Sequence, residues 1–116
     1  MTANDAIVKA NELRPNKFSD EQKYDWLMSF EGEVAEVKGV NIPQKTFPDM
    51  EHELLMAYPH DNIYPLYLAC VIDYYNQETD LYQNDTVIFE EAKKKAFSHF
   101  RRNNVPQTSG DGFKVM

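Results

Sequence analysis

Apolar residues recur at intervals of three and four positions along almost the whole chain, and this spacing most limits the possible fold. It is the period of a helix that buries one face, and it differs from the alternation of a half-buried strand. No internal repeat or low-complexity tract divides the 116 residues, a length that fits one domain. The sequence therefore predicts an all-α fold, with one bundle of about four helices over residues 1–104 and a flexible tail over residues 105–116.

The first two predicted helices have clear boundaries. The first covers roughly residues 3–13, with Thr2 as its cap. The second begins after Ser19, because the sequence SDEQ from Ser19 to Gln22 fits a capping box. In this motif the side chain of each outer residue bonds the backbone amide of the other. Gly39 is expected to end this helix. Its apolar stripe comprises five residues: Trp26, Leu27, Phe30, Val34 and Val37.

The segment that follows is expected to be irregular. Three prolines between residues 39 and 61 exclude a long helix, and short strands or one helical turn around residues 53–57 are the alternatives. A third helix is predicted over residues 62–82, with Asp61 as its cap.

The third helix carries more apolar surface than one packing face requires. Two of its three stripes are largely apolar or aromatic, and Tyr74 and Leu81 on the first stripe are expected to face the core. The remaining stripe, which contains Asp73, is expected to face solvent. Either this helix is central and nearly surrounded, or its second stripe faces another chain. In the second case the candidate subunit interface comprises Leu68, Ile72, Tyr75 and Tyr82.

The stretch DYYNQETDLYQND joins the third and fourth predicted helices. We expect Asn84 to take the left-handed conformation that ends the third helix, and Asp85 to cap a fourth helix over residues 86–103. Gln77 and Glu78 are candidates for a buried hydrogen-bonding pair. Because the carboxylates of this stretch point in different directions on a helix, it is interpreted as a corner between helices and not as a metal site.

Charge is unevenly distributed along the chain. The net charge is −7, yet the segment KKKAFSHFRR, residues 93–102, holds five basic residues and no acidic one. The rest of the chain, with seven basic and nineteen acidic residues, carries −12. Two interpretations stay open: a solvated helix end that complements the helix dipole, or a contact with an acidic partner or nucleic acid. The candidate contact residues are Lys93, Lys94, Lys95, Arg101 and Arg102.

The sequence predicts no catalytic residue, metal ligand or cofactor site. Cys70, the chain's one cysteine, lies in an apolar run and is expected to act as a small buried hydrophobe. The run Glu51-His52-Glu53 cannot converge on one ion, and no phosphate-binding glycine loop is present. No apolar run is long enough for a membrane span, and the first residues lack signal-peptide features, so synthesis in a cytosol is expected.

Short segments spread over both halves of the chain carry a resemblance to a known family. In the first half they are Leu13-Arg14-Pro15-Asn16, Lys23, Trp26-Leu27 and Glu33. In the second half they are ELLMAYPHD from Glu53 to Asp61, Tyr64, Tyr67-Leu68, Ile72-Asp73, Asn76-Gln77-Glu78, Tyr82, Asn84-Asp85, Phe89, Phe97 and Arg101-Arg102-Asn103. Their order and spacing over about residues 10–104 resemble the small head–tail connector, or adaptor, proteins of tailed bacteriophages.

The resemblance implies a helical virion protein of a phage or prophage, without enzymatic activity or cofactor. Such proteins form a ring, usually dodecameric, beneath the portal protein at the head–tail junction. They extend the channel through which DNA passes without sequence-specific binding, and they dock the stopper or tail-completion protein. The implied protein is made in the host cytoplasm and does not bind a membrane. The alternative is a small helical DNA-binding or regulatory protein that uses residues 93–102.

Overall fold

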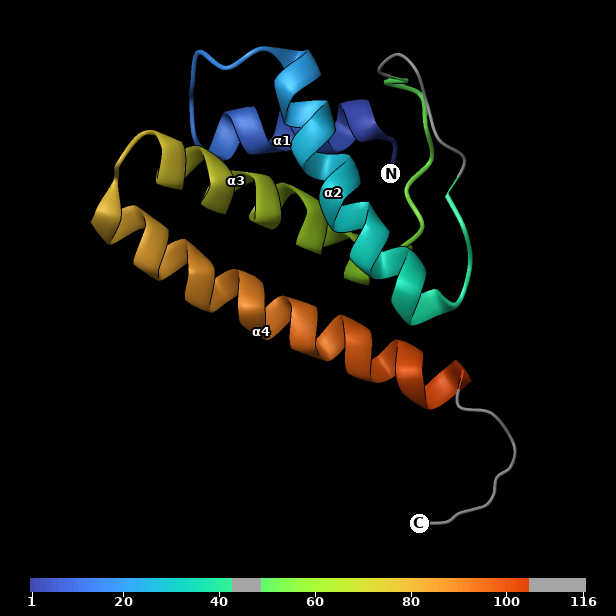
Figure 1. Cartoon of the computed structure of the whole chain (residues 1–116). Helices are drawn as coiled ribbons and strands as arrows, with labels where there is room; N and C mark the ends of the chain where they lie inside the picture. Colours follow the sequence, from blue (N-terminus) through green and yellow to red (C-terminus); the bar gives the residue numbers. More distant parts are fainter. Residues whose placement is uncertain (43–48, 105–116) are drawn as a thin grey trace.

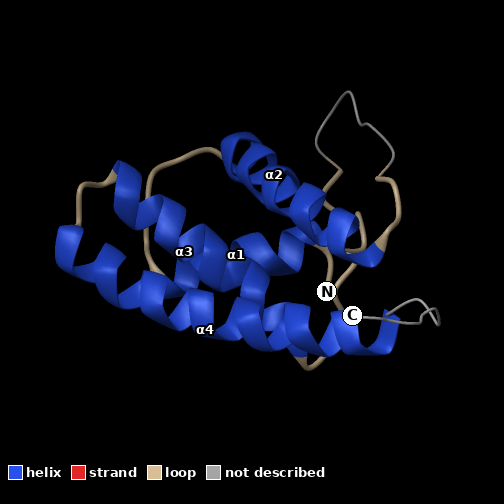
Figure 2. Ribbon diagram, turned by 60° about the horizontal axis from the view of Figure 1, so that its bottom comes forward, coloured by secondary structure: helices blue, strands red, loops and turns tan. Residues whose placement is uncertain are grey.

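The computed structural model describes residues 1–42 and 49–104, and of residues 102–104 it describes the helical backbone only. This part of the chain contains four α-helices and no strand (Figure 1, Figure 2). The elements are α1 (Ala3–Leu13), α2 (Asp20–Lys38), the 3-10 helix η1 (His60–Asn62), α3 (Ile63–Tyr75) and α4 (Thr79–Asn104). The predicted all-α class is confirmed, whereas the predicted tail over residues 105–116 lies outside the described residues.

α3 lies at the centre of the domain. It forms an antiparallel hairpin with α4, while α1 packs against α3, and α2 crosses the bundle and contacts both α3 and α4 (Figure 1). Of the two roles that the sequence leaves open for the third helix, the central one is confirmed, because α3 contacts all three other helices. Packing within one chain thus accounts for most of its apolar surface.

The predicted helix boundaries around α1 and α2 are confirmed. Thr2 and Asp5 form a capping box: the Asp5 amide donates to the Thr2 hydroxyl at 3.1 Å, and the Thr2 amide donates to the Asp5 carboxylate at 3.0 Å. At the start of α2 the Ser19 hydroxyl accepts from the Gln22 amide at 3.1 Å, whereas the reciprocal bond of the predicted capping box, between the Gln22 side chain and the Ser19 amide, does not form. Gly39 ends α2 with a φ of 72°, a left-handed conformation that glycine adopts without steric cost.

The corner between α3 and α4 lies earlier than predicted, at residues 76–78. Gln77 takes the left-handed conformation, with a φ of 59°. Its amide donates to the Tyr74 carbonyl at 3.2 Å, and the Glu78 amide donates to the Asp73 carbonyl at 3.0 Å, which is the hydrogen-bond pattern of a Schellman motif. Glycine or asparagine usually occupies this position, so a glutamine there gives no sequence signal.

Three predicted caps are therefore wrong. Asn84 and Asp85 lie inside α4, which begins six residues before Asp85, at Thr79. Asp61 does not cap the third helix, because η1 occupies that position and Asn62 precedes α3 without a side-chain capping bond. A turn that closes through backbone hydrogen bonds needs no capping side chain, and this explains why side-chain patterns mislead here.

The irregular segment predicted for residues 39–61 is confirmed over its described parts up to residue 59; residues 43–48 lie outside the description. Residues 53–57 form neither of the two predicted alternatives, a short strand or a helical turn. Instead one isolated β-bridge joins Thr2 to Glu53, so this segment lies beside the start of α1.

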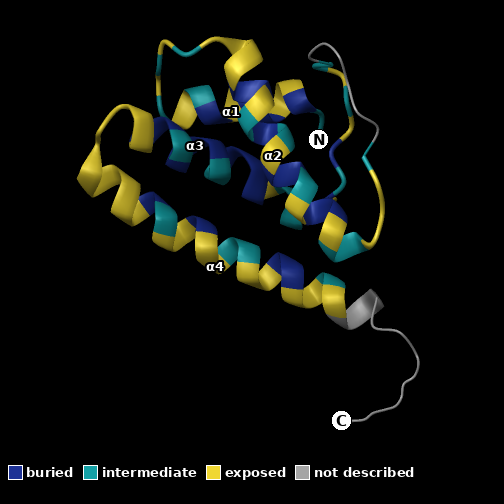
Figure 3. Cartoon of the chain, viewed as in Figure 1, coloured by how far each residue is buried: buried dark blue, intermediate teal, exposed yellow. Residues whose placement is uncertain are grey.

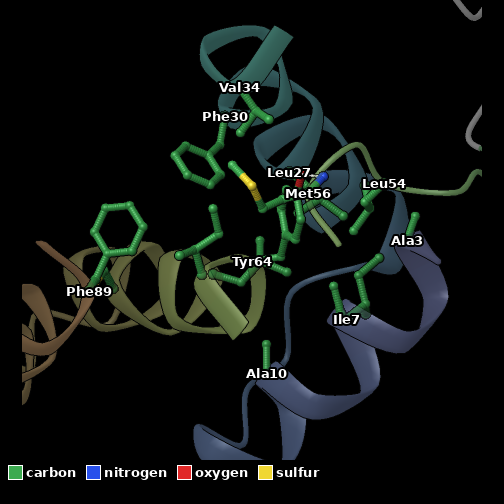
Figure 4. Packing of buried hydrophobic residues seen from close by; sticks show 14 of the residues in the cluster. Ala3, Ile7, Ala10, Leu27, Phe30, Val34, Leu54, Met56, Tyr64 and Phe89 are labelled. Carbon is green, nitrogen blue, oxygen red and sulfur yellow. Dashed lines mark hydrogen bonds between the residues drawn. The ribbon is translucent and has the colours of Figure 1, made fainter. Parts of the chain in front are cut away.

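The core is centred on Phe30 of α2. Its ring contacts those of Tyr64 and Tyr67 in α3 and those of Phe89 and Phe97 in α4, with centroids 4.8–6.4 Å apart. Figure 4 shows Phe30, Tyr64 and Phe89 among the buried residues. Truncating such a buried ring typically costs about 3–5 kcal/mol. On the other side of α3, α1 contributes small residues that let the two backbones approach closely: Ala3, Ala6 and Ala10. Figure 3 shows the buried residues on the inner faces of the helices and a continuous exposed surface around the corner.

Candidate functional site

A groove lies along the α3–α4 hairpin, at the end of the hairpin that carries the corner. Its volume is about 360 Å³, and it is lined by the second half of α3, the first half of α4 and one residue of α2. Concave, mainly apolar surfaces with few polar groups are typical recognition sites. Six aromatic side chains line this surface, which we call the aromatic groove: Trp26, Tyr67, Tyr74, Tyr75, Tyr82 and Phe89.

The rings of the groove contact one another in series. Phe18 meets Trp26 edge-on at 5.3 Å between centroids, and Trp26 stacks on Tyr75 at 5.1 Å with 4° between the ring planes. Tyr74 contacts Tyr75 at 5.1 Å and Tyr82 at 5.8 Å. Such pairs contribute about 0.5–1.5 kcal/mol each beyond the area they bury. The rings are thus held in place although Tyr74 and Tyr75 are 61% and 55% exposed.

The polar groups of the groove are not arranged for covalent chemistry. Cys70 is buried, as predicted, and burial raises the pKa of its thiol to about 11, so the sulfur stays protonated near pH 7. The Thr86 hydroxyl donates to this sulfur at 4.0 Å. Burial also raises the pKa of Tyr67. Among the lining residues only Glu90, which is exposed, carries a charge. A protonated thiol is a poor nucleophile, so the groove suits recognition of a surface.

The four residues predicted as a subunit interface separate into two pairs. Tyr75 and Tyr82 line the aromatic groove, and both are exposed. Leu68 and Ile72 are fully buried in the core of their own chain, so the prediction is wrong for these two. The reason is that α1 and α2 both pack on α3. Tyr74 shows the converse error, because it was expected in the core and lies at the surface.

The buried pair predicted at Gln77 and Glu78 is also wrong. Both side chains are exposed, because these residues form the turn itself. Leu81, expected in the core, is 37% exposed, since it belongs to the first turn of α4 and not to the end of α3.

The polar residues that are buried instead are Asp73 and Asp85, and Arg14 holds them. The Arg14 Nε lies 3.1 Å from a carboxylate oxygen of Asp73, and Nη2 lies 2.8 Å from one of Asp85. The side chains of the two aspartates are 1% and 11% exposed. We call this group the Arg14 clamp. It joins the end of α1 to α3 and α4, and it overturns the expectation that Asp73 faces solvent.

One guanidinium faces two carboxylates in the Arg14 clamp. Burial, followed by the nearby Asp85 carboxyl, raises the pKa of Asp73 to about 7, and this outweighs the opposite effect of Arg14. One oxygen of Asp73 is buried and has no hydrogen-bond partner among the described residues. The raised pKa means that Asp73 holds a proton in the folded protein below about pH 7. A lone arginine at a helix end gives no sequence signal for such a pairing.

A second buried carboxylate fixes the irregular segment to the bundle. Glu31 accepts hydrogen bonds from the Tyr64 hydroxyl at 2.6 Å and the Leu55 amide at 2.7 Å. Burial raises the pKa of Glu31, and these two hydrogen bonds oppose that shift. The His52 Nε2 lies 3.9 Å from the same carboxylate. Glu31 falls between Leu27 and Val34 on the buried face of α2, which is the signal that could have identified it.

The basic residues predicted as a partner contact do not all share one surface. Lys93 lies 3.8 Å from a Glu33 oxygen and 3.7 Å from a Glu90 oxygen, so its charge is partly compensated. Lys94 and Arg101 line a hollow of about 250 Å³ together with Lys93, whereas Lys95 lines a different one. The side chain of Arg102, the remaining candidate, lies outside the described residues. Phe97 and Phe100 of this segment pack on the core.

The sequence pattern does not predict that Trp26 lies at the surface, because Trp26 belongs to the same apolar stripe as Leu27. Adjacent residues on a helix point about 100° apart, so both cannot face the same way. Leu27 is fully buried, and Trp26 lies at the edge of the stripe, partly exposed in the aromatic groove. The width of the apolar stripe could have indicated that Trp26 lies at its edge and is partly exposed.

Over residues 1–42 and 49–104, no three His, Cys, Asp or Glu side chains gather closely enough to hold a metal ion. No helix in the same part of the chain has the length and apolar character that crossing a membrane requires.

The fold and the groove together define a small all-α domain with an exposed, preorganised aromatic surface. Comparison of the chain with protein-family models, with curated proteins and with solved structures gives no match.

Proposed function

We propose that the protein is a non-enzymatic head–tail connector of a tailed phage or prophage. In this role it forms a ring under the portal, extends the DNA channel and docks the stopper or tail-completion protein. It binds no cofactor and passes DNA without reading its sequence. Its place is the head–tail junction of the virion, after synthesis in the host cytoplasm.

The aromatic groove is the observation that carries the proposal. The rings of Tyr74, Tyr75 and Tyr82 are exposed, ring contacts hold them in place, and no described residue of the chain fills the groove. Tyrosine and tryptophan are enriched at protein interfaces, where they supply large contact areas at low entropic cost. A surface of this kind, without an activated nucleophile, suits assembly.

The residues that carry the resemblance also contact one another in the fold. Arg14 bonds Asp73 and Asp85 across three helices, and the three belong to widely separated segments of the pattern. The Asn16 side chain accepts from the Lys23 ammonium at 3.0 Å. The pattern is thus made of residues that build the domain, which supports a shared fold with the connector proteins.

The distribution of charge agrees with a ring around DNA. A net charge of −7 disfavours tight, non-specific binding of DNA phosphates. α4 has acidic residues near its start and basic residues near its end, so unlike charges can meet when copies pack head to tail.

The alternative, a DNA-binding protein that uses residues 93–102, has less support from the geometry. Lys93 lies close to two glutamates, and Lys95 lines a different hollow from that of Lys94 and Arg101. A gel-shift assay at low salt tests it: tight duplex binding that is lost on replacing Lys93, Lys94 and Lys95 by alanine would contradict the connector proposal.

The direct test is to mix the full chain with the portal ring of the same phage and to image the product by electron microscopy. We expect a second ring of this protein on one face of the portal. Failure to bind the portal at any stoichiometry would contradict the proposed function. A monomer in the absence of the portal would not, because connector rings can assemble on the portal as a template.

A further inference from the structure

A second hollow adjoins the aromatic groove at the α3–α4 corner. Its volume is about 530 Å³, and we call it the corner hollow. Tyr74 and Tyr82 line both hollows, so the two form one continuous surface at this end of the hairpin. The corner hollow adds the exposed side chains of Gln77 and Glu78 to that surface. A ligand can therefore contact the tyrosine rings and the turn at the same time.

The charged residues that line this combined surface all have one sign. No lysine, arginine or histidine lines either hollow, whereas Glu90 lines the groove, and Glu78 and Asp73 line the corner hollow. Asp73 is buried and held by Arg14, so the two exposed glutamates are the accessible charges. They lie four residues before Tyr82 and eight residues after it, a spacing that puts both on the side of α4 that carries this ring.

Lys93 does not neutralise the groove end of this surface. Its ammonium lies 3.7 Å from a Glu90 oxygen and 3.8 Å from a Glu33 oxygen, so one cation serves two carboxylates and a negative charge remains. Lys93 itself lines a neighbouring hollow and not the aromatic groove. At the corner, Asp80 in the first turn of α4 adds a further carboxylate two residues after Glu78. A positively charged occupant is thus favoured along the whole surface.

Exposed aromatic rings beside carboxylates are suited to a guanidinium group. The plane of this group stacks on an aromatic face, and its N–H groups reach carboxylate oxygens in pairs. A guanidinium is also less strongly hydrated than an ammonium, so it loses less on leaving water. The rest of the aromatic groove is mainly apolar, which suits the side chains on either side of an arginine.

We propose that the occupant of this surface is an arginine-bearing segment of a partner protein. Its guanidinium lies against the shared rings of Tyr74 and Tyr82 beside Glu78, and its apolar side chains lie in the aromatic groove. The inference deepens the proposed function and rests on it, because it names the chemistry by which a partner in the assembly binds the groove.

The test is an NMR chemical-shift titration of the full chain with three peptides, acetyl-Leu-X-Leu-amide, in which X is arginine, citrulline or lysine. Citrulline has nearly the shape of arginine without its charge. We expect the arginine peptide to bind with a Kd on the order of 1 mM, the range of weak contacts, and to shift the indole N–H of Trp26 and the amides of residues 74–82. The citrulline peptide should bind about three- to tenfold more weakly, and the lysine peptide should lie between the two.

Variants of the surface separate charge from ring contact. The double variant Glu78→Gln and Glu90→Gln should weaken binding of the arginine peptide about three- to fivefold and leave the citrulline peptide unchanged. The double variant Glu12→Gln and Glu91→Gln is the matched control, because it removes the same charge at exposed positions outside both hollows. Tyr82→Leu keeps the apolar bulk but removes the ring, and it should weaken binding of the arginine peptide about two- to fivefold.

Three results would overturn the inference. Equal affinity for the arginine and citrulline peptides would show that the surface recognises apolar groups only. A lysine peptide that binds as tightly as the arginine peptide would remove the assignment to a guanidinium. Shifts of the same residues that follow protein concentration without any peptide would assign the groove to a second copy of the chain.

Failure of the inference and failure of the proposed function give different results. A wild type that binds the portal ring but not the arginine peptide would overturn the inference and leave the function intact. A wild type that binds the peptide but not the portal would contradict the function, while the site for the arginine would stand.

Discussion

At the scale of single residues, we expect the Arg14 clamp to contribute more to the free energy of unfolding than any exposed ion pair among the described residues. Removing one partner of a buried ion pair leaves uncompensated charge in a region of low polarity, whereas exposed pairs contribute little. Here one cation serves two carboxylates from different helices, so its loss would leave both without a partner.

We expect Arg14→Met to lower the free energy of unfolding by about 3 kcal/mol. Methionine keeps much of the packing of the arginine stem but cannot pair with Asp73 or Asp85. Urea denaturation measures the change, and Lys9→Met, at an exposed position of α1, is the control with an effect within about 0.5 kcal/mol. Adding Asp73→Asn to Arg14→Met should recover part of the loss. A double variant no more stable than the single one would count against the clamp.

The raised pKa of Asp73 makes stability depend on pH. An unfolded aspartate titrates near about 3.9, whereas Asp73 in the folded protein has a pKa of about 7. Between these values the folded state holds a proton that the unfolded state has released. The contribution of Asp73 to the free energy of unfolding must therefore fall as pH rises from about 4 to about 7 and then level off.

The measurement is the difference in unfolding free energy between the wild type and Asp73→Asn at pH 5 and at pH 8. We expect the wild type to lose, relative to the variant, on the order of 2 kcal/mol over this interval. Asp25→Asn, at an exposed position of α2, should parallel the wild type. The same difference at both pH values would show that Asp73 does not titrate in this range.

At the scale of elements, the sequence predicts the two N-terminal helices well and the two C-terminal ones poorly. Thr2, Ser19 and Gly39 mark boundaries through side-chain or glycine chemistry, and such signals are local. The α3–α4 corner closes through backbone hydrogen bonds around Gln77, a residue with no preference for a left-handed turn. Helical periodicity continues across it, so the expected third helix runs on into what is the start of α4.

The same misplaced corner accounts for the errors at the candidate site. Sorting residues onto faces of one long helix gives the wrong partners once that helix ends at Tyr75. Tyr75 and Tyr82 are correctly expected at a surface, but Asp73 and Asp85 are not recognised as a buried pair. Which carboxylates meet depends on how α1 packs against the hairpin, and this is information that no local pattern contains.

Gln77→Gly should stabilise the protein by about 1 kcal/mol. The left-handed conformation costs a residue with a Cβ atom about 1–2 kcal/mol, and glycine avoids this cost. The Gln77 side chain is exposed, so no packing is lost. Gln83→Gly is the matched control within α4, where the same change should destabilise by about 1 kcal/mol. Thermal or urea unfolding gives both values, and equal signs for the two variants would contradict the assigned corner.

At the scale of the whole molecule, one core unites helices from both ends of the chain. Ala3, Ala6 and Ala10 of α1 are fully buried, while Phe97, near the end of α4, contacts Phe30 on the other side of the core. The domain has extents of 50 × 34 × 20 Å, and α4 runs along it as the longest helix of the described chain (Figure 1).

A chain that ends at residue 104 should therefore unfold with the same free energy as the full chain, within about 0.5 kcal/mol. Among the described residues the last that packs on the core is Phe100, and the sequence predicts a flexible tail over residues 105–116. A chain that ends at residue 95 is the contrasting truncation, and its loss of Phe97 should cost at least about 3 kcal/mol. Urea denaturation compares them, and a destabilised 1–104 chain would extend the domain beyond its expected end.

The stacking of Trp26 on Tyr75 gives the protein its own optical reporter. Trp26 is the chain's one tryptophan, and it lies on the wall of the aromatic groove, partly in contact with water. Any surface that fills the groove must exclude that water and change the surroundings of the indole. Emission from an unlabelled sample thus reports directly on whether the groove is occupied, in solution or on an assembled particle.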